Sequence, residues 1–422
     1  ALSHARRTVR INNQLRPMRN LFLVLVTLSG IGVSAVDQAS AQAGEIRADI
    51  IFLASDHLEG RATGSPGEML AAEYLASKFE RLGLSPRGTD GWFQDFHFTT
   101  HPNPHDSTEV VEKRGRNVIG FLDAGAEQTV VVGAHYDHLG YGGNGSRSPG
   151  DSLIHNGADD NASGVAGLLE IARQITAARV QSNNILFIAF SGEELGLFGS
   201  KHFVNNPTVD LARVNYMLNL DMVGRLREAL VVGGAGTSPV WVALIESIEK
   251  TGFTVKIDSS GLGPSDHASF YLKDIPVLHF FTGQHADYHK PSDDSPLINF
   301  EGIQQVASLA VDVIQSLDEP APIAFTKTRD QDPRRAAAFK VSLGVMPDYA
   351  FGGQGLRLDA VLDDRPAAKA GLEAGDVVVE LGGTPVNDIY SYMEALSGFK
   401  RGDQAEIVIR RGEEEVRRLV EF

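Results

Sequence analysis

Apolar runs alternate with helix-forming segments along the middle of the chain, from about residue 117 to residue 317. The runs are rich in Val, Ile, Leu and Phe, which is typical of parallel strands that are buried on both faces. The expected strands are NVIGFL (117–122), TVVVGAHYD (129–137), NILFIAF (184–190), YMLNLDMVG (216–224) and PVLHFFTG (276–283), and the expected helices are 162–175, 239–251 and 300–317. We therefore expect a three-layer α/β/α domain with a mostly parallel central sheet.

Two further helices are expected before this region. EIRADIIFLAS (45–55) forms the first, and SPGEMLAAEYLASKFERLGL (65–84) forms the second. In the second, Ser65 is the expected N-cap, Pro66 stands at the first helical position, and Glu68 completes a capping box. We assign residues 44–320 to this α/β domain.

The pattern changes after residue 317. DEPAPIAFTKTRDQDPRR contains three prolines and many charges, and we place a linker at 321–338. Residues 339–422 then show short alternating strands, glycine-rich turns and one short helix. We expect a second, small β-rich domain there.

The N-terminal segment has the composition of a secretory signal peptide. RPMRN carries positive charge, LFLVLVTLSGIGVSA is apolar, and Ala-Gln-Ala ends at Ala43. The apolar run is shorter than the ~20 residues that a membrane-spanning helix needs, which favours a cleaved signal over a membrane anchor. We expect residues 1–43 to be removed, the mature chain to begin near Gly44 without stable membrane insertion, and the protein to be exported to the periplasm or the extracellular space.

The net charge and the cysteine content limit the ligands that the chain can bind and the residues that can hold a metal ion. The 422-residue chain has 54 acidic and 38 basic residues, a formal net charge of −16, which disfavours binding to nucleic acid. It contains no cysteine, so any metal site must be built from His, Asp and Glu, the ligands of a zinc-like ion.

Titratable residues follow the expected strands directly. Because ligands bind outside the carboxyl ends of strands in open α/β sheets, these side chains should meet at one edge. They are His135 and Asp137; Glu193 and Glu194; Asp221; Asp287 and His289; and, at the start of a helix, Asp159 and Asp160. So many carboxylates need cations to neutralise them. His135 and His289 with Asp159, Glu194 and Asp221 form a suitable ligand set for two divalent ions if one carboxylate bridges, and Glu193 is left unbound beside them.

Each of these residues also has a purely structural interpretation. Asp159 or Asp160 can cap the following helix, and Glu193 and Glu194 can be first-turn acids. Either histidine can be an ordinary hydrogen-bonded loop residue. Because these residues are expected together at the ends of four strands, one metal site is favoured over a separate structural role for each residue. Four more histidines lie in the same loops but have no distinctive spacing: His138, His155, His267 and His285.

Six ordered motifs make the chain similar to metallopeptidase family 28, the relatives of bacterial leucyl-aminopeptidases and glutamate carboxypeptidases. The motifs are GAHYDHLG, GADDNASG, SGEELGLFGS, NLDMVGR, SDHASF and DYHKPSDD, within about residues 45–317. The resemblance implies two zinc ions held by His135, Asp159, Glu194, Asp221 and His289, with Asp159 bridging. It also implies that Glu193 is the general base.

Three other residues have expected supporting roles. Asp137 lies two positions after His135 and is expected to fix the tautomer of that imidazole. Tyr288 precedes a ligand and is expected either to donate to the oxyanion or to pack in the wall of the site. Asp266 in SDHASF is expected to support a ligand or to cap a helix.

The C-terminal domain resembles a PDZ domain of bacterial envelope proteases. SLGVMPD (342–348) matches the carboxylate-binding loop, with Leu343, Gly344 and Val345 as the expected peptide-binding residues. Such domains add a peptide as an extra strand, so protein C-termini are expected partners, unless the domain only packs and binds nothing. The expected function is an exported zinc aminopeptidase that acts on peptides. Alternatives are a carboxypeptidase or other amidohydrolase on the same scaffold, or a non-catalytic peptide-binding envelope protein.

Overall fold

The computed structural model describes most of the chain. The described residues are 35–100, 111–143, 145–148, 152–178, 180–250, 252–328, 341–347, 354–361, 365–387, 391–392, 395–396, 398–412 and 414–422. Residues 1–34 of the predicted signal segment and residues 329–338 of the predicted linker lie outside them. Within the described residues, no helix is long and apolar enough to cross a membrane.

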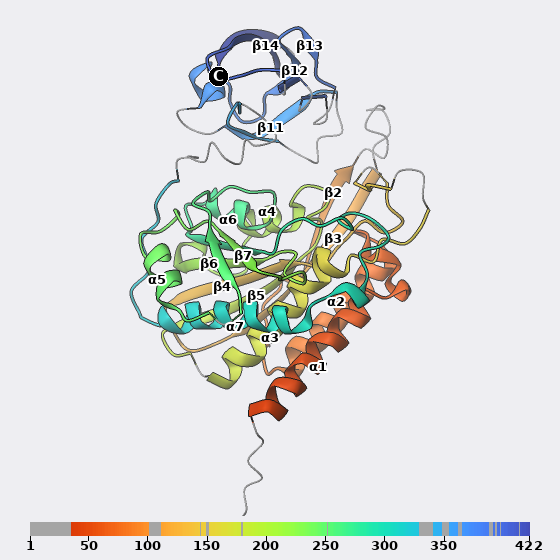
Figure 1. Cartoon of the computed structure of the whole chain (residues 1–422), viewed down its shortest axis with the longest axis vertical. Coiled ribbons are helices and arrows are strands. Elements are labelled where there is room, and N and C mark those ends of the chain that lie inside the picture. The colour runs from red at the N-terminus through yellow and green to blue at the C-terminus, as the bar shows by residue number, and fades with distance from the viewer. Residues whose placement is uncertain are drawn as a thin grey trace, which may run out of the picture.

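The larger domain is built on a nine-stranded sheet (Figure 1). Its four central strands are parallel, in the order β5, β4, β6, β9. On one side of this set, β3 pairs with β5 in the antiparallel direction. On the other side, β7 pairs with β9 in the antiparallel direction, and β8 pairs with β7. The strands are β1 (Ser85–Pro86), β2 (Phe93–Thr100), β3 (Val111–Leu122), β4 (Gln128–His135), β5 (Asn183–Phe190), β6 (Val214–Leu220), β7 (Ala229–Gly233), β8 (Thr254–Ile257) and β9 (Val277–Phe281).

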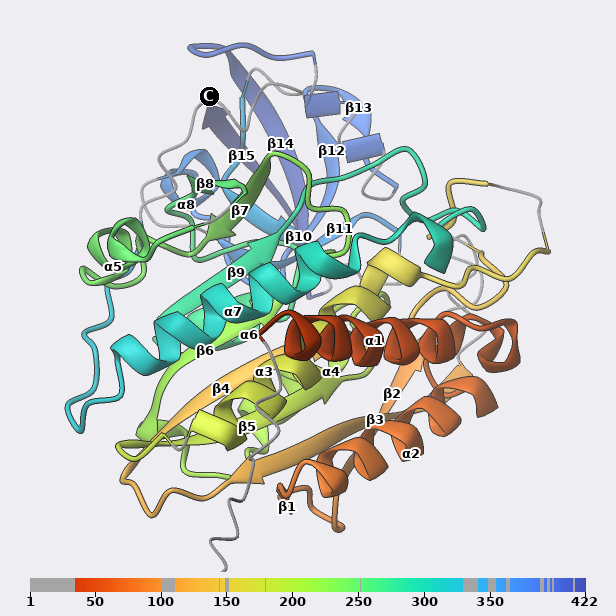
Figure 2. The same cartoon turned by 60° about the horizontal axis from the view of Figure 1, so that its bottom comes forward.

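Helices cover both faces of this sheet. Helices α1, α2, α3 and α7 pack on one face, where Figure 2 shows them in front of the strands, and α4 and α6 pack together on the other. The helices are α1 (Ala35–Leu53), α2 (Pro66–Arg81), α3 (Gly164–Ala178), α4 (Phe198–Asn205), α5 (Trp241–Ser247), α6 (His267–Tyr271) and α7 (Phe300–Ser316). The predicted three-layer α/β fold is confirmed.

The strand register divides the apolar side chains between two cores. In β4, Val130 and Val132 belong to the core under α3 and α7, while Val131 faces the core under α4 and α6. All three are fully buried. Because neighbouring side chains on a strand point to opposite faces, a continuous apolar run is what a doubly covered sheet requires.

The second domain is an antiparallel six-stranded sheet with its own core. It contains β10 (Val345–Pro347), β11 (Leu356–Val361), α8 (Pro366–Lys369), β12 (Val377–Leu381), β13 (Thr384–Pro385), β14 (Gln404–Arg411) and β15 (Glu414–Glu421). Leu343 is fully buried in this core, so the segment before β10 is anchored.

Glu68 at the start of α2 is a buried carboxyl group. Ser65 caps the backbone N–H of Glu68, as predicted, but the Glu68 carboxylate accepts from the N–H of Gly64 rather than from Ser65. It also accepts a short hydrogen bond from the hydroxyl of Ser191, which follows β5. Burial raises the pKa of Glu68 to about 8.

Replacing Glu68 with Gln is expected to change how stability depends on pH. The folded-state pKa of Glu68 lies above that of the unfolded chain, so its contribution to stability is lost as pH rises toward and through about 8. The variant lacks this titration. Relative to the wild type, its free energy of unfolding should therefore rise by roughly 2 to 4 kcal/mol between about pH 5 and about pH 9. Urea denaturation of both proteins, each metal-free, measures this difference, and equal pH slopes would show that Glu68 is ionised in the folded protein.

Candidate metal centre

The carboxyl ends of the parallel strands bring the predicted side chains together. His135 ends β4, Glu193 and Glu194 follow β5, Asp221 follows β6, and His289 lies in the loop after β9. The turn η2 (Ala158–Ser163) before α3 adds Asp160. His289 has a φ of +58°, a backbone conformation that non-glycine residues adopt rarely and that often occurs at functional sites.

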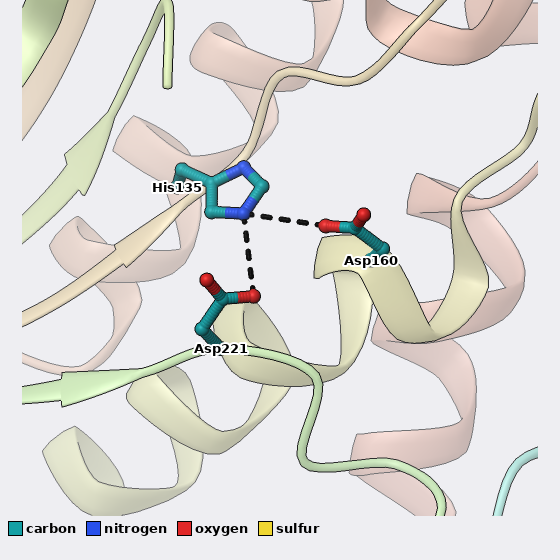
Figure 3. Close-up of side chains that lie close together, drawn as sticks. All are labelled: His135, Asp160 and Asp221. Atoms are coloured by element: carbon teal, nitrogen blue, oxygen red, sulfur yellow. Dashed lines mark ion pairs between the residues drawn. The ribbon is translucent and has the colours of Figure 1, made fainter. Parts of the chain in front are cut away.

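One group of ligand atoms surrounds His135 (Figure 3). Its Nε2 lies 3.4 Å from Oδ1 of Asp160 and 3.5 Å from Oδ1 of Asp221. The three side chains are almost completely buried. On the far side of the ring, Nδ1 lies 3.2 Å from the backbone oxygen of Asp137, which favours the tautomer with Nε2 free to bind a metal.

A second group shares Asp160. Nε2 of His289 lies 3.1 Å from Oδ2 of Asp160 and 3.2 Å from Oε2 of Glu194. Nδ1 of His289 donates to the backbone oxygen of Gly145, at 2.8 Å, so Nε2 is again the free nitrogen. The two oxygens of the Asp160 carboxylate therefore belong to different groups, as a bridging ligand requires.

The spacing in both groups fits zinc. Ligand atoms about 2.0 to 2.1 Å from a tetrahedral ion lie roughly 3.3 Å from one another, close to the separations around Asp160. His138 is also near the second group, with Nδ1 4.0 Å from Oδ2 of Asp160. Its Nδ1 is only 2.6 Å from Oε1 of Glu194, however, which is a hydrogen bond rather than the separation of two ligands on one ion. His289 is thus the better candidate for the histidine ligand of the second group, and His138 orients Glu194 through a hydrogen bond.

Asp159, the predicted bridging ligand, does not face the other predicted ligand side chains in the structure. Its Oδ1 accepts from the backbone N–H of Gly224, at 2.6 Å, and from the hydroxyl of Ser163, at 3.0 Å. Its Oδ2 lies 3.0 Å from Nε2 of His285. These contacts join three loops, so Asp159 has a structural position and the neighbouring Asp160 occupies the shared one.

Asp293 fixes the backbone of the same turn. Its fully buried Oδ2 accepts from the backbone N–H groups of Asp159 and Asp160, at 2.9 and 3.1 Å. Its Oδ1 pairs with Arg225 at 3.1 Å. Two backbone hydrogen bonds to one carboxylate hold the turn in place, and sequence spacing carried no signal of them.

Glu193 lies beside the cluster without joining either group. Its Oε2 is 3.9 Å from Nε2 of His135, and its side chain is as little exposed, at 11 %, as that of Asp221, at 12 %. Burial, with neighbouring carboxylates, raises the pKa of Glu193 well above its usual range. The carboxylate of Asp137 accepts from the backbone N–H of Glu193 at 3.1 Å and from the hydroxyl of Thr63 at 2.9 Å. Oδ1 of Asp137 also lies 3.7 Å from Nδ1 of His135, so the Asp137 carboxylate contacts both Glu193 and His135.

Tyr288 and Asp266 both lie near the cluster. The Tyr288 ring stacks on His289 with ring centroids 3.8 Å apart. Burial and the nearby carboxylates raise the pKa of Tyr288, so its hydroxyl is protonated and can donate. Asp266 precedes α6 but makes no capping hydrogen bond. It is fully buried, and burial raises its pKa to about 7.

Arg61 is a buried cation that supports the site. Its guanidinium donates to the backbone oxygens of Tyr136 at 2.7 Å, Asn156 at 2.7 Å, Gly157 at 3.1 Å and, by a short bond, Leu53. It thereby ties the end of α1 to the segments that carry His135 and Asp160. Burial lowers the pKa of Arg61 to about 10, so it remains charged near neutral pH.

The predicted peptide-binding loop of the second domain precedes β10. Gly344 has a φ of +72°, and a Cβ there would lie 2.2 Å from Cβ of Arg365, so only glycine fits. The Gly344 N–H donates to the hydroxyl of Ser342 at 3.0 Å. Val345 is half-buried at the start of the edge strand β10.

Two family models match the chain. The model described as "Peptidase family M28" matches residues 117–314, and the model described as "PDZ domain" matches residues 323–421. The second match begins inside the predicted linker, so the exact domain boundaries stay predictions. Both resemblances found in the sequence motifs are confirmed.

Similar proteins include aminopeptidases. Aminopeptidase YwaD of Bacillus subtilis is 35 % identical over 43 % of this chain, and leupeptin-inactivating enzyme 1 of Streptomyces exfoliatus is 30 % identical over 56 %. The matched parts cover 39 % and 48 % of those proteins, so this chain spans less than half of their length. BSAP, a zinc aminopeptidase from Bacillus subtilis, has a similar fold, with a TM-score of 0.52 and 19 % identity over 69 % of this chain and 97 % of that structure.

Proposed function

We propose that the chain is an exported zinc aminopeptidase, because residues 117–314 match the model of peptidase family M28 and residues 323–421 match the model of a PDZ domain. The observation that carries this proposal is the position of Asp160, whose two carboxylate oxygens face two separate histidine and carboxylate groups. Such an arrangement suits two ions that share one ligand, with Glu193 beside them as a proton acceptor.

The proposed ligands fall into two sets. His135, Asp221 and Asp160 would hold one zinc ion, and His289, Glu194 and Asp160 would hold the other. When bound there, zinc would lower the pKa of a coordinated water and polarise the carbonyl group of the substrate.

Glu193 is the proposed general base. Its carboxylate accepts a proton from the attacking water and delivers it to the leaving amine, so that the carboxylate is regenerated in each cycle. Asp137 keeps Glu193 in position by accepting its backbone N–H. The Tyr288 hydroxyl is the proposed hydrogen-bond donor to the developing oxyanion, because it is protonated and the Tyr288 ring stacks on His289.

The remaining proposals concern location and partners. The apolar run at 21–35 and the Ala-Gln-Ala sequence support export with cleavage after Ala43. The glycine loop before the edge strand β10 supports capture of a peptide C-terminus by the PDZ domain.

An assay of the purified full-length chain tests the function. Leucine p-nitroanilide and its N-acetylated form are compared in zinc, after treatment with 1,10-phenanthroline, and after zinc is restored. We expect turnover of the free amine only, lost with the chelator and recovered with zinc. Equal turnover of the blocked substrate would favour another amidohydrolase. No turnover of any peptide by zinc-loaded protein would favour a peptide-binding protein.

A further inference from the structure

Arg147 is an exposed cation close to the proposed metal centre. Its Cζ lies 4.6 Å from the ring centre of Tyr288, in a cation–π contact, and the Tyr288 ring stacks on His289. The Tyr288 ring therefore lies between the guanidinium and the imidazole of His289, a proposed zinc ligand, at stacking distances of 4.6 and 3.8 Å. A guanidinium that stacks by its face keeps its N–H edge free to donate.

The backbone fixes Arg147 relative to His289. The Arg147 N–H donates to the backbone oxygen of His289 at 2.9 Å, and Nδ1 of His289 donates to the backbone oxygen of Gly145 at 2.8 Å. The hydroxyl of Ser146 accepts from the N–H of Ser148 at 2.9 Å. These hydrogen bonds hold the backbone of residues 145–148 against His289, from which the Arg147 side chain reaches the Tyr288 ring.

In the part of the chain that the structure describes, no carboxylate lies within ion-pair distance of Arg147. Arg225, by contrast, pairs with Asp287 at 3.4 Å and Asp293 at 3.1 Å. Arg61 is buried and donates to backbone oxygens. An exposed guanidinium that pairs with no carboxylate of the described residues and stacks on Tyr288 has the chemistry to bind an anion from solution.

We propose that Arg147 binds a free carboxylate of the substrate, so that the preferred substrates are peptides with a negative charge one or two residues from the scissile bond. This rests on the proposed peptidase function. Consecutive Cα atoms are about 3.8 Å apart, so one or two residues of a peptide span a length comparable to the stacking distances of 3.8 and 4.6 Å that separate His289 from Arg147. The carboxylate has two possible sources: the C-terminus of a short peptide, or an Asp or Glu side chain.

Matched substrate pairs separate the two sources. Leu-Gly against Leu-Gly-amide tests the C-terminal carboxylate. Leu-Glu-amide against Leu-Gln-amide, and Glu-p-nitroanilide against Gln-p-nitroanilide, test acidic side chains on either side of the bond. We expect the wild type to prefer the charged member of at least one pair by about threefold to tenfold in kcat/KM. Arg147→Gln should abolish that preference, mainly through KM, and 0.5 M NaCl should weaken it in the wild type.

Two variants complete the design. Arg147→Lys keeps the charge but lacks the planar fork, and should retain part of the preference. Arg213→Gln removes an exposed arginine that pairs with Asp210 at the opposite end of β6, and should keep all of it. Calorimetry of the same pairs with the zinc-loaded Glu193→Gln background gives the preference as a ratio of Kd values, without any turnover.

The outcomes are distinct. Loss of the charge preference in Arg147→Gln alone, by kinetics or by Kd, supports the proposal. No preference for a charged substrate in either measurement, or an equal preference in wild type and Arg147→Gln, overturns it. Absence of hydrolysis with a preserved, Arg147-dependent Kd ratio would contradict the peptidase function but not the carboxylate site.

Discussion

Glu193→Gln is expected to lower kcat by about 10²- to 10⁴-fold and to leave the zinc content unchanged. Gln has the shape of Glu but cannot accept the proton from the attacking water. Glu193 is the carboxylate that contacts His135 only at 3.9 Å and belongs to neither ligand group, so its charge is not needed to hold an ion. Steady-state kinetics with leucine p-nitroanilide and metal analysis of the dialysed protein measure both quantities.

Glu194→Gln is the matched control at the adjacent position. Glu194 lies 3.2 Å from Nε2 of His289, so its replacement should lower zinc affinity and activity together. Activity of Glu193→Gln close to that of the wild type, or equal loss of zinc in both variants, would refute the separate roles of these two residues.

Asp160→Asn is expected to remove most bound zinc, whereas Asp159→Asn should keep it. An Asn side chain presents one oxygen and no negative charge, so it cannot serve two ions. At position 159 the same change leaves an oxygen to accept from Gly224, and the amide can face His285. It should lower the free energy of unfolding by about 1 to 3 kcal/mol, because a buried hydrogen bond to a charged group is weakened. Zinc analysis and urea denaturation of both variants give the two readouts.

The opposite result for the two variants would identify Asp159 as the ligand that both ions share. If Asp159→Asn lost zinc and Asp160→Asn retained it, the arrangement around Asp160 would not be the metal-bound one. Equal loss in both variants, with both proteins folded, would mean that the shape of the turn rather than one carboxylate holds the ions.

The sheet could be predicted from the sequence because burial on both faces leaves a strong signal. The runs at 129–137 and 184–190 correspond to β4 and β5, and the residues that follow them reach one edge, as expected. Strands β1, β2, β7 and β8 were not predicted. They lie outside the central parallel set, and β8 has exposed side chains that carry no apolar pattern.

The choice between Asp159 and Asp160 could not be made from spacing. Adjacent residues in a regular helix point in directions about 100° apart, but the turn η2 is irregular, with non-helical φ and ψ at Asp160. Which carboxylate faces the histidines depends on distant partners, namely Gly224, His285 and Asp293.

The supporting residues Arg61 and Asp293 could not be predicted from the sequence either, and the reason is physical. Arg61 acts through backbone oxygens up to 96 positions away, and no local pattern records such contacts. Asp293 lies 133 positions from the N–H of Asp160 that it holds. Residues of this kind become recognisable only when the fold brings the segments together.

The central claim is that two metal ions share Asp160, and anomalous diffraction tests it most directly. Crystals of the full chain grown with zinc would be measured on both sides of the zinc absorption edge. The arrangement predicts two peaks about 3.5 to 4 Å apart, one between His135 and Asp221 and one between His289 and Glu194, with Asp160 between them. A single peak, or a peak bound by Asp159, would contradict it.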